Sequence, residues 1–175
     1  MPRSQRQTSG SSLTAVLIST RAGVFTAHFS ERGLARLDFP KGQNAGVAER
    51  EEANLAVWVR LTEQAIGAIL NGRNPHALPP LDLRSGTPFQ QRVWAALRAI
   101  PAGHTRSYSE IASAIGSPKA ARAVGGACGA NPIPLLVPCH RVLASGGKLG
   151  GFSGGLDWKR RLLAAEEVIS RSVKQ

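Results

Sequence analysis

The hexapeptide VPCHRV at residues 137–142 places the thiol of Cys139 directly beside the imidazole of His140. A cysteine reacts as a nucleophile in its thiolate form, and a neighbouring imidazole is a common acceptor for the thiol proton. Adjacent residues of an extended chain point in opposite directions, so we expect either a local helical turn or a bridging water between the two groups. Adjacency alone is a weak signal, since most free cysteines are small buried hydrophobes.

His140 also needs an acceptor that orients its ring through the second nitrogen. A helix is predicted over residues 157–169, where Leu162 and Leu163 form an apolar pair to bury. The carboxylates of residues 85–175 are Glu110, Asp157, Glu166 and Glu167. The last two fall on the predicted helix, and the residues alone leave the choice among the four open.

The segments on either side of Cys139 differ in stiffness. Three prolines, at positions 132, 134 and 138, stiffen the approach to the cysteine, and the later segment ASGGKLGGFSGG has six glycines in twelve residues. A rigid approach followed by a mobile segment is typical of the rim of an active site, and an ordinary surface loop is the alternative.

The residues before Cys139 predict the helices that must position it. The tetrapeptides TPFQ at 87–90 and SYSE at 107–110 are capping boxes, which predict a helix over residues 88–99 and a shorter one that stops at Gly116. Ser117 and Pro118 are predicted to start a third helix. Two short helices joined by Gly-Ser indicate either a helix-turn-helix, whose second helix would read DNA, or a plain αα-hairpin.

The third predicted helix consists almost wholly of alanine and glycine, with Arg122 and Val124 as its bulky side chains. Small residues permit a close approach of the backbone to another surface. That surface is either a second helix or a nucleic-acid backbone, with Arg122 as the one long projection.

The first half of the sequence predicts a small sheet and a helix. Three β-prone runs in residues 12–40, separated by RAG and ERG, predict an antiparallel meander. Apolar residues recur every three or four positions in residues 48–70, which predicts a helix closed by Asn71 and Gly72. The Pro- and Gly-rich residues 71–86 are the predicted connection. We therefore expect an α/β (α+β) protein with an N-terminal α/β lobe at 1–84 and a mainly helical domain at 85–175.

The charge is concentrated in the second half. The net charge is +11, and residues 85–175 hold 12 basic and 4 acidic residues against 10 and 7 in residues 1–84. This asymmetry favours a polyanionic partner.

The only early apolar run, LTAVLI, is too short for a signal peptide or a membrane span, and two cysteines eleven positions apart suggest no disulfide framework. We expect a cytoplasmic protein without a membrane partner.

The longer pattern NPIPLLVPCHRV, with GGFSGG and LLAAE after it, resembles the O6-alkylguanine-DNA alkyltransferases, also called methylated-DNA–protein-cysteine methyltransferases. The resemblance covers nearly all of residues 87–167, whereas the N-terminal lobe matches only in general layout. It implies an RNase H-like N-terminal lobe followed by a winged helix-turn-helix domain that holds the active site.

The resemblance also implies a role for each motif residue. Cys139 is the alkyl acceptor, and His140 and Glu166 are its water-linked activating relay. Asn131 is the hinge between the reader helix and the site. Tyr108 rotates the 3′ phosphate of the target nucleotide and donates a hydrogen bond to the base.

Further implied residues contact DNA or the extracted base. Arg122 fills the gap that the extruded guanine leaves, and Val142 lies where the pocket reads the guanine amino group. Ser153 holds the O6 atom, while Phe152 stands where many family members have tyrosine, which alters the polarity of the pocket. The implied DNA surface is Tyr108, Ser109, Ser117, Ala121, Arg122 and Ser145.

No cofactor and no metal are expected. Some family members bind a structural zinc in the N-terminal lobe, but this lobe has no cysteine, and only His28 and His76 remain as soft ligands.

The expected activity is that of a single-turnover methylated-DNA–[protein]-cysteine S-methyltransferase. It repairs DNA by direct reversal, transferring the alkyl group of O6-alkylguanine, and less readily of O4-alkylthymine, from double-stranded DNA to Cys139. We expect a monomer and leave cooperative binding along DNA open.

One alternative is a noncatalytic alkyltransferase-like protein or helix-turn-helix regulator, which would not need Cys139. The other is a Cys-His hydrolase with Glu166 as third member, which would leave the basic half without a role.

Overall fold

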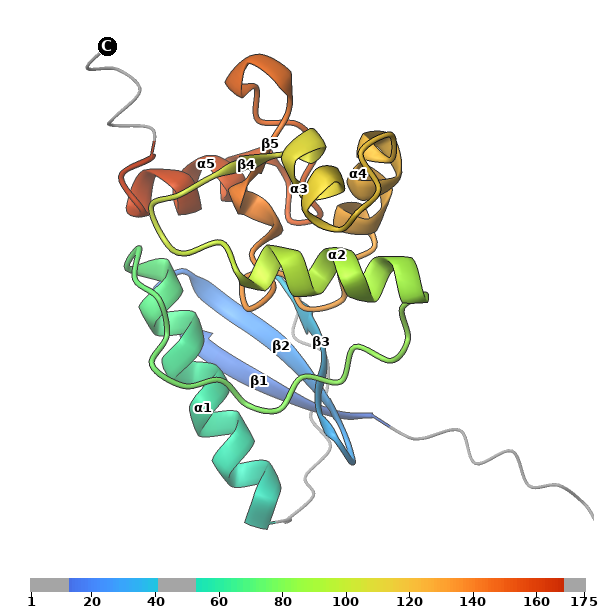
Figure 1. The fold of residues 1–175 in the computed structure, drawn as a ribbon. Coiled ribbons are helices and arrows are strands. Elements are labelled where there is room, and N and C mark those ends of the chain that lie inside the picture. Colours follow the sequence, from blue (N-terminus) through green and yellow to red (C-terminus); the bar gives the residue numbers. More distant parts are fainter. Residues whose placement is uncertain (1–12, 41–52, 169–175) are drawn as a thin grey trace, which may run out of the picture.

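The computed structural model describes residues 13–40 and 53–168, and its first part is a three-stranded antiparallel sheet (Figure 1). The strands β1 (Thr14–Thr20), β2 (Gly23–Ser30) and β3 (Gly33–Asp38) pair in that order, so the predicted meander is confirmed. Gly23 and Gly33 follow the two tight turns with positive φ angles of 115° and 138°, a conformation that favours glycine. Strand β2 directs alternate side chains into the core, namely Phe25, Ala27 and Phe29.

Helix α1 (Ala53–Leu70) packs against the sheet beside β1 (Figure 1). Its buried side chains include Ile66 and Ile69, two of the positions that the three-and-four spacing singled out, and Gly72 closes it with a φ of 70°. The predicted first turn at residues 48–52 lies outside the described residues. None of the described helices is long and apolar enough to cross a membrane.

The predicted connection at residues 71–86 pairs with the edge of the sheet. The Leu34 N–H donates to the Pro80 carbonyl at 2.8 Å, and the Asp82 N–H donates to the Leu34 carbonyl at 2.8 Å. The chain therefore forms a short parallel bridge alongside β3, between Leu34 and Leu81, before it enters the second half. A domain boundary at residue 84 stays a prediction.

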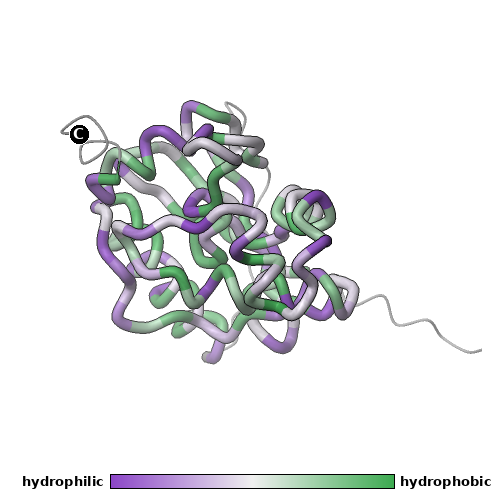
Figure 2. The backbone as a smooth tube through the Cα atoms, turned by 45° about the horizontal axis from the view of Figure 1, so that its top comes forward, coloured by the Kyte–Doolittle hydropathy of each residue, from purple (hydrophilic) through white to green (hydrophobic). Residues whose placement is uncertain are grey.

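The second half is mainly helical and lies beside the sheet (Figure 1). Its elements are α2 (Pro88–Arg98), β4 (Arg106–Ser107), α3 (Tyr108–Ala114), α4 (Ala121–Gly129), the 3₁₀ helix η1 (Cys139–Arg141), β5 (Val142–Leu143), η2 (Ser145–Gly147) and α5 (Leu156–Ala165). The Trp94 indole of α2 donates to the Ala127 carbonyl of α4 at 2.8 Å, which joins the two helices inside the core. The apolar stretches gather toward the middle of the molecule in Figure 2.

Both predicted capping boxes are confirmed. The Thr87 hydroxyl accepts from the Gln90 N–H at 3.3 Å, while the Gln90 side chain accepts from the Thr87 N–H at 2.8 Å. Ser107 and Glu110 make the same reciprocal pair at 3.2 and 2.6 Å. These bonds satisfy N–H groups that a helix start otherwise leaves unpaired.

One predicted helix start and one predicted helix end are wrong. Residues 117–120 form a turn, closed by a 2.8 Å bond from the Ala120 N–H to the Ser117 carbonyl, so the third helix begins at Ala121 and not at Ser117. Helix α5 ends at Ala165, well before residue 169. Glu166 is its C-cap, and Glu167 adopts a left-handed φ of 59°, which stops the helix.

Candidate active site

Cys139 and His140 lie on the buried 3₁₀ turn η1, so the expected local helical turn is confirmed. Cys139 is 4% exposed and His140 is fully buried. The approach segment folds back on itself, because the Val137 N–H donates to the Ile133 carbonyl at 2.9 Å and Leu135 adopts a left-handed φ of 76°. The prolines thus belong to a rigid, buried platform under the cysteine.

Glu166 is the carboxylate that orients His140, of the four that the sequence left open. His140 Nε2 lies 2.9 Å from Glu166 Oε1, and both groups are buried. The Arg141 guanidinium donates to the same carboxylate through Nε and Nη2, at 3.0 and 2.9 Å, and to the Ile100 carbonyl through Nη1 at 2.5 Å. Glu110 instead caps α3, and Asp157 pairs with Arg160 on the surface.

The Glu166 contact fixes which nitrogen of His140 can act as a base. Burial tends to raise the pKa of Glu166, but the hydrogen bonds from His140 and Arg141 outweigh it and lower that pKa to about 2. Burial lowers the pKa of His140, so the neutral ring carries its proton on Nε2 toward the carboxylate. Nδ1 is then free to accept a proton, and it is the one buried side-chain nitrogen or oxygen without a hydrogen-bond partner among the described residues.

Asn131 holds the sulfur of Cys139. Its Nδ2 donates to Cys139 Sγ at 3.2 Å and to the Val137 carbonyl at 2.8 Å, while Oδ1 accepts from the Ile133 N–H at 3.0 Å. Burial raises the pKa of Cys139, and the Asn131 bond and the charge of Lys159 oppose that shift. The resting sulfur is therefore a thiol, and its activation requires a base.

Lys159 is a site residue that the sequence analysis missed. It is fully buried on α5, and its ammonium donates to the Val142 carbonyl at 2.6 Å and the Gly151 carbonyl at 3.4 Å. Burial lowers the pKa of Lys159, and the neighbouring Cys139 and Cys128 oppose that shift. One signal for it was present, because Lys159 lies three and four positions before the buried Leu162 and Leu163 and so shares their face of the helix.

Tyr108 and the glycine segment face each other at the site. Tyr108 opens α3 and is half-buried, and a Cβ on Gly150 would lie 2.8 Å from its hydroxyl. Burial, and then the nearby thiols of Cys128 and Cys139, raise the pKa of Tyr108. Its hydroxyl therefore stays protonated and able to donate a hydrogen bond at neutral pH.

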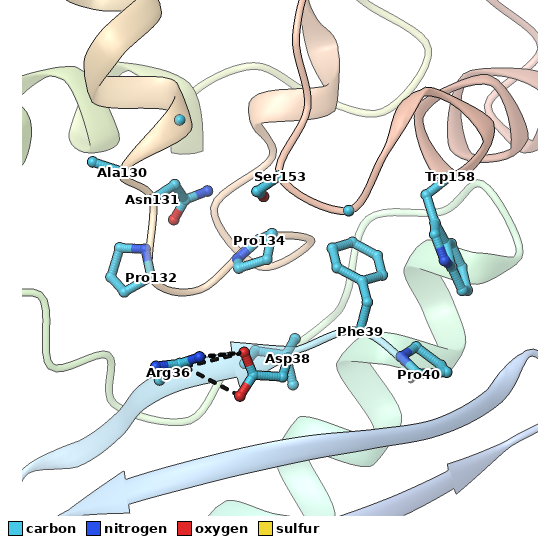
Figure 3. A pocket seen from close by; sticks show the side chains of 13 residues that line it. Arg36, Asp38, Phe39, Pro40, Ala130, Asn131, Pro132, Pro134, Ser153 and Trp158 are labelled. Carbon is cyan, nitrogen blue, oxygen red and sulfur yellow. Dashed lines mark hydrogen bonds and ion pairs between the residues drawn. The ribbon is translucent and has the colours of Figure 1, made fainter. Parts of the chain in front are cut away.

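The predicted base-pocket residues surround the reactive turn. Val142 is fully buried in β5, and the ring of Phe152 meets that of His140 edge-on at 6.4 Å. The exposed Ser153 lines a cavity of about 460 Å³ together with Asn131 and Pro134 (Figure 3). Phe152 thus contacts His140, and Ser153 shares a cavity with Asn131, while the roles of these side chains at a bound base stay predictions.

The predicted DNA-contact residues lie around the α3–α4 turn and in η2. Arg122 is exposed on the first turn of α4, and Ser109 is exposed on α3. Ser117 and Ala121 are partly exposed at the turn and the helix start, and Ser145 is exposed in η2. Their contribution to DNA binding stays a prediction.

The predicted absence of a metal also stays a prediction. His28 is paired with Asp38 at 2.9 Å, and His76 is exposed in the connection. Within residues 13–40 and 53–168 no three His, Cys, Asp or Glu side chains are grouped as metal ligands.

Comparison with known proteins places the chain in a family. The family described as 6-O-methylguanine DNA methyltransferase, DNA binding domain, matches residues 88–168. The methylated-DNA–protein-cysteine methyltransferase of Methanosarcina barkeri is 41% identical over 154 residues, which cover 86% of this chain and 95% of the relative. The chain belongs to the methylated-DNA–protein-cysteine methyltransferase family. The resemblance noted in the sequence is thereby confirmed.

Two mycobacterial proteins of the methyltransferase family extend the comparison. The methylated-DNA–protein-cysteine methyltransferase of Mycolicibacterium paratuberculosis is 56% identical over 103 residues. These residues span 59% of this chain and 62% of the relative. A crystal structure of Mycobacterium tuberculosis OGT in complex with DNA aligns with a TM-score of 0.68 at 41% identity, over 86% of this chain and 91% of that one. The α/β fold of the methyltransferase family therefore extends over most of the described chain.

The position of Lys159 generates a test at the thiol itself. We expect Lys159→Met to raise the pKa of Cys139, because the substitution removes a buried positive charge that favours the thiolate. The pH profile for alkylation of Cys139 by iodoacetamide should shift to higher pH. At neutral pH the alkylation should become about tenfold slower, the effect of one pKa unit. Arg160→Met removes a neighbouring exposed charge and serves as the control. An unchanged pH profile in Lys159→Met would show that the lysine only links the two carbonyls.

Proposed function

We propose that this protein repairs DNA by direct reversal, transferring the alkyl group of O6-alkylguanine irreversibly to Cys139. One observation carries the proposal: a buried thiol that accepts a hydrogen bond from Asn131 lies beside a neutral His140 whose ring is fixed by Glu166. The names of the curated relatives support the same reaction. We also propose that the protein acts as a cytoplasmic monomer and that O4-alkylthymine is a poorer substrate.

In the proposed reaction the thiol proton of Cys139 moves to His140 Nδ1 through a bridging water. The thiolate attacks the alkyl carbon, a C–S bond forms, and the bond from that carbon to O6 breaks. The electron pair goes to the guanine, and the Tyr108 hydroxyl, Ser153 and backbone amides stabilise the resulting anion until it is protonated. Glu166 meanwhile stabilises the transient imidazolium of His140.

The thioether product has no described partner that would remove it. Cys128 is the other thiol, and burial together with the proximity of Cys139 raises its pKa to about 12. It therefore stays protonated and is a poor nucleophile toward the alkylated sulfur. Each protein molecule accordingly acts once.

Access to the O6 carbon requires the target base to leave the DNA stack. The surface of α4 supports a close approach to DNA, since a Cβ on Gly126 or Gly129 would meet nothing within 4 Å. The opposite face of α4, with Val124 and Ala127, is buried against the core. This arrangement favours a DNA-reading helix-turn-helix over an αα-hairpin whose small residues serve only for packing, and it leaves Arg122 free to enter the stack.

Both alternative functions fit the site less well. A noncatalytic damaged-DNA binding protein would give no role to Cys139, Asn131 and His140 as a connected set. A Cys-His hydrolase would use the same set, but the exposed glycine face of α4 and the basic second half would then serve no purpose.

Mass spectrometry tests the proposed transfer. After mixing with excess duplex containing O6-methylguanine, the protein should gain one methyl group, located on the Cys139 peptide, and demethylation should plateau at one event per molecule. Cys139→Ala should abolish transfer and retain binding to DNA, because only the nucleophile is lost. Cys128→Ala is the matched control and should transfer normally. Sustained turnover, or a methyl group on Cys128, would contradict the proposal.

The role of Arg122 can be separated from phosphate binding. If its guanidinium replaces the extruded base, Arg122→Ala should slow repair of duplex DNA by about ten- to a hundredfold, given an unstacking cost of a few kcal/mol. Reaction with a free O6-alkylguanine base, which needs no extrusion, should change little. Arg122→Lys should restore the duplex rate only in part, since lysine lacks the planar guanidinium that can stack and donate several hydrogen bonds.

Arg98→Ala, which removes an exposed arginine from the end of α2, serves as the control for charge. Full rescue by lysine, with a shallower salt dependence of binding, would instead assign Arg122 to a phosphate. Equal losses of rate on duplex DNA and on the free base would contradict the insertion of Arg122 into the base stack.

A further inference from the structure

The end of strand β3 reaches the active site from the N-terminal lobe. The Leu37 N–H donates to the Pro132 carbonyl at 2.9 Å, one residue after the Asn131 that holds the Cys139 sulfur. Phe39 follows β3 directly and lies next to the segment of Ser153 and Gly154 (Figure 3). The lobe thus contacts both sides of the site, the platform under the cysteine and the glycine-rich rim.

The ring of Phe39 belongs to an aromatic cluster that joins three parts of the fold. It lies 5.7 Å from Phe25 in the sheet, 5.0 Å from Trp158 on α5 and 5.5 Å from Phe152 on the rim. Phe152 is the side chain that meets the His140 ring edge-on. A chain of ring contacts therefore runs from the core of the N-terminal lobe to the general base.

Gly154 shows how closely Phe39 limits the rim. A Cβ on Gly154 would lie 2.5 Å from Cε2 of Phe39 and 2.8 Å from Cδ2 and Cζ. Gly154 is absent from the residues with positive φ, so space and not backbone conformation excludes a side chain there. The Phe39 ring is thus packed against the backbone of the rim, between Ser153 and Gly155.

Two other residues outside the rim contact it, both near Gly150 and Gly151: Lys159 donates to the Gly151 carbonyl at 3.4 Å, and the Tyr108 hydroxyl faces Gly150. Gly146, Gly147, Gly150 and Gly155 all adopt positive φ angles, and backbone bonds within the segment are short-range, such as that from the Ala144 N–H to the Lys148 carbonyl at 2.7 Å. Glycines lose the most conformational freedom when they become ordered. The Phe39 ring contacts the next part of the rim, at Phe152 and Gly154, on either side of Ser153.

We propose that Phe39 is a positioning residue for alkyl transfer and that this contact is the contribution of the N-terminal lobe to the reaction. The inference rests on the proposed function, because it assigns Phe39 to the placement of Phe152 as pocket wall and Ser153 as donor. A displacement of such groups by about 1 Å lowers a rate by up to about a hundredfold. Phe39 itself touches neither the thiol nor the base.

Truncation of Phe39 gives the first test. Phe39→Ala should lower the second-order rate of methyl transfer from duplex O6-methylguanine by about ten- to a hundredfold, and Phe39→Leu should lower it less. Phe29→Ala is the control, since Phe29 is a buried ring of the same sheet that stacks on Trp58, away from the rim, whereas Phe39 is partly buried. Rates are compared per folded molecule, at temperatures where all variants are folded.

Hydrogen exchange of residues 150–155 reads the position of the rim without any transfer. Phe39→Ala should speed exchange there and Phe29→Ala should not. If the two variants differ in exchange in this way but the wild-type protein transfers no methyl group, the proposed function fails and the positioning role stands. If exchange and transfer are the same in Phe39→Ala and Phe29→Ala, the positioning role is wrong and the proposed function is unaffected.

A double-substitution cycle tests the contact directly. Gly154→Ala should slow transfer by itself, because its methyl group meets the Phe39 ring. In the Phe39→Ala background the space is open, so Gly154→Ala should cause little additional loss. Multiplicative losses in the double variant would overturn the inference, since they would show that the two positions act separately.

Discussion

The carboxylate of Glu166 is the interaction on which the rest of the site depends. It lies at the end of α5, receives hydrogen bonds from His140 and Arg141, and accepts from the Gly103 N–H at 3.2 Å in the segment after α2. A buried carboxylate is costly unless its oxygens are fully hydrogen-bonded, and removal of one partner of such a pair leaves an uncompensated charge. The reactive turn, α5 and the segment after α2 are therefore joined at one point.

The N-terminal lobe approaches the same point from the other side. Gly72, which closes α1 with a positive φ, packs so closely against α5 that a Cβ there would lie 1.9 Å from the Ala165 carbonyl, one residue before Glu166. Phe39 and Leu37 meet the rim and the platform. The lobe thus supports the glycine-rich rim and the end of α5, although it supplies no nucleophile or base.

In the proposed function, this arrangement keeps a protein that acts once intact before it meets its substrate. Burial raises the pKa of Cys139, so the resting sulfur is a thiol and not a thiolate that any alkylating agent would consume. The neutral His140, the Asn131 donor and the Lys159 charge are already in place to favour the thiolate once a carbon is presented. Reactivity then depends on the arrival of a correctly placed base.

The sequence predicted those features that depend on neighbouring residues. The meander and both capping boxes depend on residues a few positions apart, and their local chemistry was enough to predict them. The choice of Glu166 among four carboxylates depended on packing across 26 positions, and a capping or periodicity pattern does not contain that information. The start of α4 was wrong because Ser117 closes a turn with Ala120 instead of capping a helix.

Two further residues were missed because tertiary packing gives them their roles. Lys159 is a charged residue on the buried face of α5, where its ammonium finds two carbonyls that no local pattern predicts. Phe39 follows a strand and reads as an ordinary core residue, and its contact with Gly154 joins positions 115 apart in the sequence. The family resemblance supplied roles for the motif residues but none for these two.

We infer that the resting site holds a neutral Cys139–His140 pair with the imidazole proton on Nε2. Nitrogen NMR of labelled histidine between about pH 6 and 8, with the His140 signals assigned from a His140→Asn variant, reads this state directly. We expect a protonated Nε2, an unprotonated Nδ1 and no conversion to imidazolium in that range. Two protonated nitrogens near neutral pH would reveal a resting thiolate–imidazolium pair, and a proton on Nδ1 alone would remove the proposed base.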